Sequence, residues 1–401
     1  MELRSALAAV ALIATVAHAQ PPVVDNPSTP PAGRTARDAT ELWRVGGYDE
    51  DFLFGIVGSA AVAGDGTTYL LDEQLSEITA IDPDGRVVAT FGRAGEGPGE
   101  MDQGRGIMML PGGRVGVLNM RPPKLITYDA AGTPAGDVSL VGNEGFHFAI
   151  AATAAGDRVV VQTASTTIRE TTQVSENALR AVDPATGEFV VDYLIHSEER
   201  DRLGSGGDVV ITIGSPDFVG DWALAADGTL YAVRDPDDYA IEVRDARGEH
   251  VRTIRRAFER VPRQEEDVER DMAQRRAMAE RTGGSFDPDT VDTLEPAIVD
   301  VFARPDGELW VLPGEGLAIE DPEVVGVFDV FDRQGRFVRQ VELRAPYDRA
   351  TDRMTLQGDA LVVFEDLVGA RGGGMMIMGD AVEQEEDDEE ADPLAIARYR
   401  I

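Results

Sequence analysis

The stretch that decides the fold runs from Asp65 to Phe91 and reads DGTTYLLDEQLSEITAIDPDGRVVATF. An Asp-Gly turn opens it and precedes the run Thr68 to Leu71, and a second run, Ile78 to Ile81, ends on an aspartate. Gly85 then precedes a last run, Arg86 to Phe91. Glycines in such turns supply the positive φ angles that tight hairpins need. Together with the apolar segment before the first turn, the stretch predicts four antiparallel strands.

The same sequence pattern recurs along the chain. Its first turn appears six times, at Asp65-Gly66, Gly112-Gly113, Gly156-Asp157, Asp227-Gly228, Asp306-Gly307 and Gly358-Asp359. Its third strand ends on an aspartate in five units, at Asp82, Asp129, Asp183, Asp245 and Asp332. The sixth unit lacks this ending, and Leu394 to Ile401 is its predicted third strand.

Six four-stranded units in series predict an all-β fold, a six-bladed β-propeller over residues 39–401. Because no blade buries both of its faces alone, the ring has to close. We expect Glu41 to Val45 to form the outer strand of the last blade, which joins the two ends of the chain. The alternative of two stacked β-sandwiches accounts less well for the regular repeat.

Two segments depart from the repeat. Residues 262–284 predict a helix, with Glu266–Arg270 and Asp271–Arg275 as ion pairs one turn apart. This helix is interpreted as a lid on the channel mouth, a partner surface or a decoration between blades. Residues 370–392 combine a Gly- and Met-rich start with an acidic run, which predicts a solvated, disordered loop.

The first residues are typical of an export signal. Residues 1–19 contain an apolar stretch, Ala6 to Ala17, and end in a small-residue cleavage site after Ala19. The stretch is too short for a membrane span, which needs about 20 residues. We therefore expect a cleaved signal peptide and a periplasmic or secreted protein. Residues 20–38 are Pro-rich and predict a flexible lead-in.

Charge and composition exclude several classes of partner. The 401 residues include 37 Lys and Arg against 73 Asp and Glu, a net charge of −36, and no cysteine. An acidic surface repels the phosphates of nucleic acids and disfavours anionic membranes. The absence of cysteine excludes disulfides and thiolate metal sites.

Candidate site residues emerge when the inner strands are aligned on their hairpin turns. The position six residues before each turn is occupied by Ser59, Gly106, Ile150, Asp221, Asp300 and Asp352. The three aspartates fall on consecutive blades, and their carboxylates are ligands that Ca²⁺ prefers. Arg105 and His147 are expected near the same rim. The predicted ligand site is thus Ser59, Arg105, His147, Asp221, Asp300 and Asp352, with the three aspartates as a metal site if calcium binds; no cofactor is required.

The run Phe91 to Met101, FGRAGEGPGEM, lies between the first two predicted blades. With the Asp-Gly turns and the Asp-ending strands, it resembles the NHL-repeat six-bladed propellers of exported bacterial proteins. Blades three and six lack this loop. The resemblance implies a fold more firmly than a function, because the family includes ligand-binding, protein-binding and enzymatic members. Related propeller lactonases and lyases use a metal in the channel.

Catalytic motifs are missing from the sequence. It has no His-Glu-x-x-His motif and no Gly-x-Ser-x-Gly elbow on a strand-to-helix turn. Only His147, His196 and His250 follow the signal peptide, and His196 and His250 are expected on the outer rim, which argues against a three-histidine centre. The favoured function is an exported, non-catalytic and monomeric propeller that binds a protein, peptide or glycan through its channel face. The alternative is a metal-assisted hydrolase or lyase.

Overall fold

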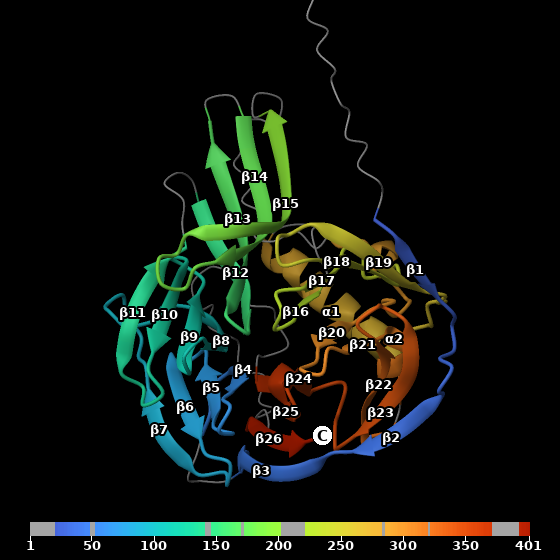
Figure 1. Cartoon of the computed structure of the whole chain (residues 1–401), viewed down its shortest axis with the longest axis horizontal. Helices are drawn as coiled ribbons and strands as arrows, with labels where there is room; N and C mark the ends of the chain where they lie inside the picture. The colour runs from blue at the N-terminus through green and yellow to red at the C-terminus, as the bar shows by residue number, and fades with distance from the viewer. Residues whose placement is uncertain are drawn as a thin grey trace, which may run out of the picture.

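The computed structural model describes residues 21–48, 53–140, 146–169, 172–201, 221–282, 285–319, 321–370 and 393–401. The predicted signal peptide lies outside these residues, and so does the predicted acidic loop apart from its first residue. Six sheets surround a central channel, and the first strand of each lies closest to the middle (Figure 1). The prediction of a six-bladed, all-β propeller is confirmed.

The first three blades follow the chain from the channel outward. Blade 1 contains β4 (Val57–Val62), β5 (Thr68–Asp72), β6 (Glu77–Ile81) and β7 (Val87–Phe91). Blade 2 contains β8 (Gly104–Leu110), β9 (Arg114–Asn119), β10 (Lys124–Tyr128) and β11 (Pro134–Ser139). Blade 3 contains β12 (Phe146–Ala155), β13 (Arg158–Ile168), β14 (Thr172–Val182) and β15 (Phe189–Asp201), whose long strands project beyond the ring (Figure 1).

The other three blades each include a strand from the N-terminal part of the chain. Blade 4 contains β16 (Trp222–Leu224), β17 (Leu230–Val233), β18 (Ala240–Arg244) and β19 (His250–Arg256), with β1 (Val23–Asn26) at its edge. Blade 5 contains β20 (Asp300–Ala303), β21 (Leu309–Leu312), β22 (Val324–Phe331) and β23 (Phe337–Arg344), with β2 (Arg34–Asp38) at its edge. Blade 6 contains β24 (Arg353–Gln357), β25 (Ala360–Glu365), β26 (Ala395–Arg400) and β3 (Thr40–Gly46).

The N-terminal strands correct one prediction and confirm another. Residues 20–38 were expected to be flexible, but β1 pairs in parallel with β19 and β2 pairs in parallel with β23. The physical reason is that the outer edges of blades 4 and 5 offer free backbone groups, which an extended Pro-rich segment can pair with. The predicted closure is confirmed, because β3 pairs antiparallel with β26 and completes blade 6.

The repeated Asp-x-x-Gly sequence has a local cause. In blade 1, Oδ1 of Asp82 accepts hydrogen bonds from the backbone N–H groups of Asp84 and Arg86, at 3.0 and 2.9 Å. Gly85 then adopts a φ of +85°, and a Cβ there would lie 2.6 Å from the Cβ of Trp43. The aspartate therefore holds the turn between the third and fourth strands, and the glycine lets it approach β3.

The hydrophobic core is divided among the blade boundaries. Six clusters of buried side chains occur among the described residues, and each contains residues of two neighbouring blades. The cluster between blades 6 and 1 includes Trp43 from β3 together with Leu70 and Ile396. The closing strand thus contributes a buried aromatic side chain as well as backbone hydrogen bonds.

The helices are few and lie in connections. α1 (Glu265–Thr282) joins blades 4 and 5, and the 3₁₀ turn η1 (Pro288–Thr290) follows it. α2 (Gly314–Leu317) and α3 (Leu367–Ala370) are single turns in blades 5 and 6. The predicted helix is present, but Pro262 does not start it: this residue forms a β-bridge with Leu294.

One of the two predicted ion pairs on the helix is found. Arg275 contacts Asp271 at 2.7 Å, as predicted. Arg270 contacts Asp267, three residues earlier, in place of Glu266. Positions three and four residues apart are both neighbours on a helix surface, so sequence spacing alone does not choose between them.

Candidate functional site

Two of the six predicted site residues meet. Asp221 lies just before β16, and Asp300 is the first residue of β20. Both carboxyl groups accept a hydrogen bond from the same backbone N–H, that of Val301, at 2.7 and 2.8 Å. Their side chains also bond to each other. The two residues that the alignment of inner strands makes equivalent thus lie side by side, across the boundary of blades 4 and 5.

Burial and mutual repulsion favour a single proton between these two carboxyl groups. Burial, followed by the negative charge of Asp221, raises the pKa of Asp300 well above its ordinary value. Burial also raises the pKa of Asp221, although backbone hydrogen bonds oppose the change. Two close carboxylates without a cation cannot both ionise cheaply. A proton between them accounts for their direct hydrogen bond.

Asp352 occupies a separate loop at the start of blade 6. Its Oδ2 accepts from the N–H of Asp348 at 2.8 Å, and its Oδ1 accepts from the N–H of Asp366 at 2.9 Å. The backbone of Asp352 returns a hydrogen bond to the carbonyl of Asp348 at 2.7 Å. Its carboxylate is 6 % exposed and holds the loop that precedes β24.

The predicted calcium site does not fit this arrangement. Within the described ranges, no group of three His, Asp or Glu side chains is arranged to hold a metal ion. Asp221 and Asp300 are bonded to each other, and Asp352 is bonded to backbone N–H groups of its own loop and of the loop after β25. A divalent ion needs several free carboxylate oxygens directed at one point.

The remaining predicted residues lie on inner strands of blades 1, 2 and 3. Ser59 in β4 has a buried hydroxyl without a hydrogen-bond partner in the described part of the chain. Arg105 in β8 forms an ion pair with Glu73 at 3.4 Å and so links two blades. His147 in β12 pairs across the sheet with Ser165. The six residues therefore lie in or directly before the inner strands of six different blades, and the hydrogen bonds described above join only Asp221 to Asp300.

Sequence reasoning missed a cleft at the loops of blades 5 and 6. Its volume is about 980 Å³. Its walls come from the end of β3, the start of α1, the loop after α2, the loop before β24 and both sides of the loop after β25. These segments are remote in sequence and share no motif, so only the closed ring brings them together.

Two arginines of the cleft are already neutralised. Arg44 contacts Glu41 at 2.9 Å and also pairs with Glu365. Arg349 contacts Asp267 at 2.7 Å and Glu295 at 2.8 Å. Each guanidinium thus has two carboxylate partners, which satisfies its charge within the protein.

An aromatic residue lies between these polar groups. The hydroxyl of Tyr347 donates a hydrogen bond to the carbonyl of Asp352 at 3.3 Å. Burial raises the pKa of Tyr347 to about 12, and Asp352 and Asp300 add to the rise. The phenol is therefore neutral at physiological pH and offers the cleft an apolar ring with a polar tip.

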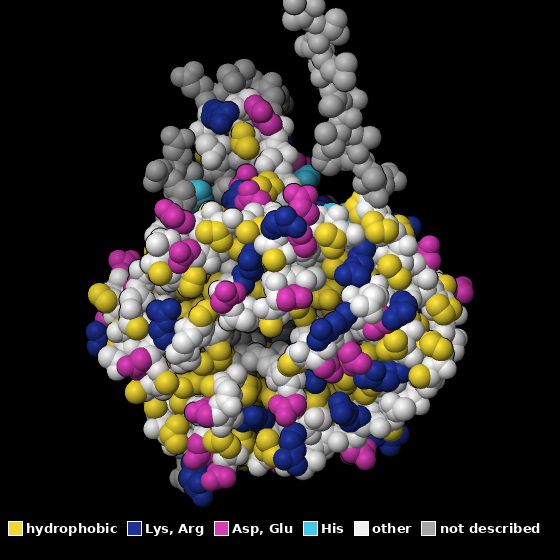
Figure 2. Space-filling model, viewed as in Figure 1, with side chains coloured by type: hydrophobic (Ala, Val, Ile, Leu, Met, Phe, Trp, Pro, Cys, Tyr) yellow, Lys and Arg dark blue, Asp and Glu magenta, His cyan; other side chains and the backbone are white. Residues whose placement is uncertain are grey.

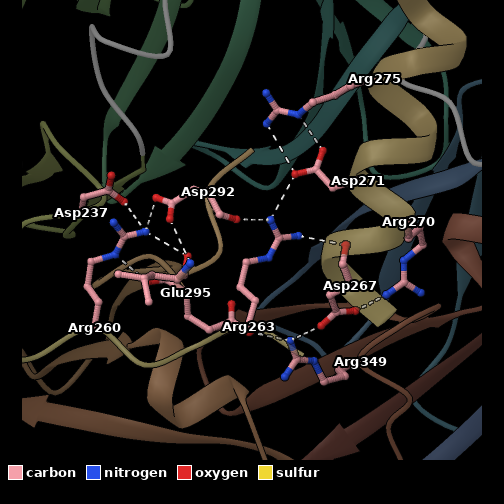
Figure 3. A network of polar contacts seen from close by, with 11 residues as sticks. Asp237, Arg260, Arg263, Asp267, Arg270, Asp271, Arg275, Asp292, Glu295 and Arg349 are labelled. Atoms are coloured by element: carbon pink, nitrogen blue, oxygen red, sulfur yellow. Dashed lines mark hydrogen bonds and ion pairs between the residues drawn. The ribbon is translucent and has the colours of Figure 1, made fainter. Parts of the chain in front are cut away.

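Helix α1 forms one wall of the cleft and is anchored by ion pairs (Figure 3). Arg349 reaches Asp267 in its first turn, and Arg263 reaches Asp271 at 3.1 Å. Arg260 pairs with Asp292, in the segment between η1 and β20, and with Asp237, in the loop between β17 and β18. The site is thus built on one rigid ring with a polar, ion-paired wall.

The face of the molecule that is seen in Figure 1 is mixed in charge. Figure 2 shows acidic and basic side chains interspersed around a hollow at the middle of the ring.

Among the described residues, no helix has the length and apolar character needed to cross a membrane.

Solved structures with a similar fold were found, whereas no protein-family model and no curated protein sequence matches the chain. Regucalcin from Agrobacterium tumefaciens, a calcium-binding protein, has 11 % identity and a TM-score of 0.43, covering 91 % of this chain and 96 % of its own. Virginiamycin B lyase from Staphylococcus aureus has 10 % identity and a TM-score of 0.41, covering 90 % and 98 %. A member of the duf4221 family from Bacteroides vulgatus has 10 % identity and a TM-score of 0.47, covering 90 % and 97 %.

The chain is a six-bladed β-propeller, and this assignment rests on its own strand pairing. Identities near one residue in ten carry no statement about activity.

Proposed function

We propose that the protein is an exported, non-catalytic propeller that binds a protein, peptide or glycan in the cleft of blades 5 and 6. The observation that carries this proposal is the cleft itself. Its volume of about 980 Å³ lies at the upper end of the range typical of ligand sites. Its walls come from segments that are joined only in the closed ring, so the fold supplies a preformed surface.

The chemistry of the lining favours binding over catalysis. The described residues that line the cleft include no serine, threonine, cysteine, histidine or lysine. A serine, threonine, cysteine or lysine nucleophile with a histidine base is therefore missing from this lining. Its two arginines are held by carboxylates, and Asp352 is held by backbone N–H groups.

The alternative, a metal-assisted hydrolase or lyase, requires a divalent ion near the substrate. No observation on the described residues favours it, because the carboxyl pair of Asp221 and Asp300 is closed on itself. Export is proposed from the signal sequence of residues 1–19. Mass spectrometry of protein from the native host should find a chain that begins at Gln20.

A blocking substitution tests the cleft. The mature chain, residues 20–401, would be applied to an immobilised peptide library and to a glycan array. Ala350 is a small residue of the cleft lining, so Ala350→Trp should fill part of the cleft and abolish binding. Ala131 is exposed in a turn of blade 2, and Ala131→Trp is the matched control that should bind normally. Equal binding by both variants would place the ligand elsewhere.

A further inference from the structure

We infer that the ligand of the cleft is a cationic peptide segment that alternates basic and apolar side chains. This inference rests on the proposed function, because it assigns a ligand class to the same cleft. It is argued from three features: the satisfied arginines, the carboxylates without ion pairs, and the apolar floor.

The first feature is that the cleft has no cation to offer. Arg44 is bound by Glu41 and Glu365, and the hydroxyl of Tyr399 lies 3.0 Å from its Nη2. Arg349 is bound by Asp267 and Glu295. An anionic ligand would have to displace these carboxylates, and each displaced group would then lose a charge-assisted hydrogen bond.

The second feature is a set of exposed carboxylates at the rim. Asp321, Glu323 and Asp348 line the cleft and form no ion pair among the described residues. Among the described residues, the carboxylate of Asp321 accepts one hydrogen bond, from Glu323 N–H at 3.0 Å, and the carboxylate of Asp348 accepts one, from Ala350 N–H at 2.8 Å. Carboxylate oxygens have room for further donors, so an ammonium or guanidinium group complements them.

The third feature is the apolar surface between these charges. Leu317, Ile319, Pro322 and Tyr347 all line the cleft and are at least partly exposed. A purely polar cation such as a polyamine would leave this surface uncovered. A peptide covers it with alternate side chains while its basic residues reach the rim.

The charge of the whole molecule acts in the same direction. At −36 the protein attracts cations over long range, which raises the rate of encounter with a basic partner. The net charge attracts any cation to any part of the surface, whereas the rim carboxylates would bind the cation at the cleft. The experiment therefore has to separate the cleft from the overall charge.

Three fluorescent peptides of equal length provide the probes, with the repeats Leu-Lys-Ser, Leu-Glu-Ser and Leu-Gln-Ser. Fluorescence anisotropy would measure their binding to the mature chain in low salt and in about 0.5 M salt. We expect only the lysine peptide to bind, with weaker affinity in high salt because exposed charges are screened. Binding of the glutamine or glutamate peptide with equal affinity would overturn the inference.

A triple variant and its matched control localise the effect. The variant Asp321→Asn, Glu323→Gln, Asp348→Asn removes three rim charges and should weaken binding of the lysine peptide about tenfold. The control Asp157→Asn, Glu188→Gln, Glu249→Gln removes three exposed charges on blades 3 and 4 and should change it less than twofold. Equal losses in both would mean that the overall charge alone causes the attraction, and this would overturn the inference.

The Ala350→Trp variant separates this inference from the proposed function. If the uncharged peptide binds and Ala350→Trp abolishes that binding, the cleft is a ligand site but its preference is not cationic. If the lysine peptide binds equally to wild type and to Ala350→Trp, the cleft itself is rejected. No binding of any of the three peptides would also overturn the inference.

Discussion

Two segments cross the boundary between blades 4 and 5 in different ways. The strap, residues 21–38, crosses it at the outer edge through β1 and β2. The helical insertion, residues 262–294, connects the last strand of blade 4 to the first strand of blade 5 and contains α1. The strap is held by backbone pairing and by buried groups beneath it, whereas the insertion is held by side-chain ion pairs (Figures 1 and 3). We infer from this difference that the strap mainly stabilises the fold, whereas the insertion mainly shapes the cleft.

Asn26 is the side chain that fastens the strap to both blades. Its amide nitrogen donates to the carbonyls of Arg255 at 2.9 Å and Gly335 at 3.0 Å. Its amide oxygen accepts from the N–H of Phe337 at 2.8 Å. One amide thus satisfies backbone groups on the outer strand of blade 4 and on the last turn of blade 5.

A buried charge pair lies beneath the strap. The guanidinium of Arg256 contacts Asp329, which is fully buried and also accepts from the hydroxyl of Tyr239 at 2.6 Å. The same guanidinium donates to the carbonyl of Ser28 in the strap at 3.3 Å and lies 5.1 Å from the ring centre of Tyr239. The strap therefore covers a charged side chain of which only 4 % is exposed.

The helical insertion lacks such a core. The helix residues from 265 to 280 are all partly or fully exposed. Its contacts include the ion pairs of Arg263, Arg270 and Arg349 with the aspartates of its first turns. Ion pairs that remain in contact with solvent contribute little to stability, typically about 0–1 kcal/mol each. The insertion is thus expected to affect the cleft more than the fold.

The largest effect is expected beneath the strap. Asp329→Ala leaves the buried guanidinium of Arg256 with Glu315 as its remaining carboxylate partner and leaves the hydroxyl of Tyr239 without its acceptor, so the free energy of unfolding should fall by about 3–5 kcal/mol. Urea denaturation at pH 7 measures this loss. Asp359→Ala, at an exposed turn of blade 6, is the control and should stay within about 0.5 kcal/mol of wild type. A loss below about 1 kcal/mol for Asp329→Ala would mean that backbone pairing alone secures this side.

The next effect concerns the strap itself. Asn26→Ala leaves the N–H of Phe337 and two carbonyls without their partner, and should cost about 1–3 kcal/mol. Hydrogen exchange of residues 23–26 should become faster, because β1 then depends on its ladder with β19 alone. Thr35→Ala is the control, since the hydroxyl of Thr35 is exposed and its hydrogen bond to Gln340 is long, at 3.4 Å. Unchanged exchange in Asn26→Ala would show that the amide does not fasten the strap.

The sequence predicts the ring well because the repeat is local. Each Asp-x-x-Gly turn is fixed by hydrogen bonds within a few residues, as at Asp82, and the alternation of strands follows. The strap is different: every residue of β2 is exposed, so its side chains carry no apolar pattern. Only the free edges of distant strands assign it a structure, and these are known only once the ring is built.

The candidate site, like the fold, was predictable from the sequence only in part. Strand register aligns Asp221 with Asp300, but burial raises the pKa of both carboxyl groups and the charge of Asp221 raises that of Asp300 further, which the sequence does not show. Asp352 has the same position before its strand, yet the loop from Asp348 folds back and takes its oxygens. The cleft depends on six remote segments and has no signature in any one of them.

A third prediction tests the inner end of the same boundary, where two like charges meet. Because its pKa is raised, Asp300 keeps a proton in the folded state that the unfolded chain releases above about pH 4. The free energy of unfolding should therefore fall as the pH rises from about 4 through the folded pKa of Asp300. Asp300→Asn carries no such proton, so this fall should become shallower.

The measurement is urea denaturation at several pH values between 4 and 8. Near pH 5 the variant should differ from wild type by less than about 1 kcal/mol, because the amide retains a hydrogen bond to Asp221. Asp157→Asn, at an exposed turn of blade 3, is the control and should keep the wild-type slope. Identical slopes in all three proteins would contradict a shared proton.

The smallest effect on stability is expected for the helical insertion. Pro262 and Leu294 form a β-bridge, and the N–H of Arg263 donates to the carbonyl of Thr293 at 2.9 Å. The two ends of the insertion are therefore adjacent, and replacing residues 264–290 by Gly-Gly closes a short turn while keeping the buried Val291. Arg349 retains Glu295, and Arg260 retains Asp237, so no buried charge is left without a partner. The free energy of unfolding should change by less than about 1 kcal/mol.

Binding should respond in the opposite way to stability. The excision removes Gln264 and Glu266, which form one wall of the cleft, so affinity for the lysine peptide should fall while urea denaturation stays near wild type. Asn26→Ala should show the reverse, a clear loss of stability with unchanged affinity below its unfolding transition, because the strap does not line the cleft. If the excision costs as much stability as Asp329→Ala, the insertion belongs to the cooperative core of the ring. The division of roles between strap and insertion would then be wrong, because ion pairs on an exposed helix would stabilise the fold as much as the buried pair and the backbone ladder do.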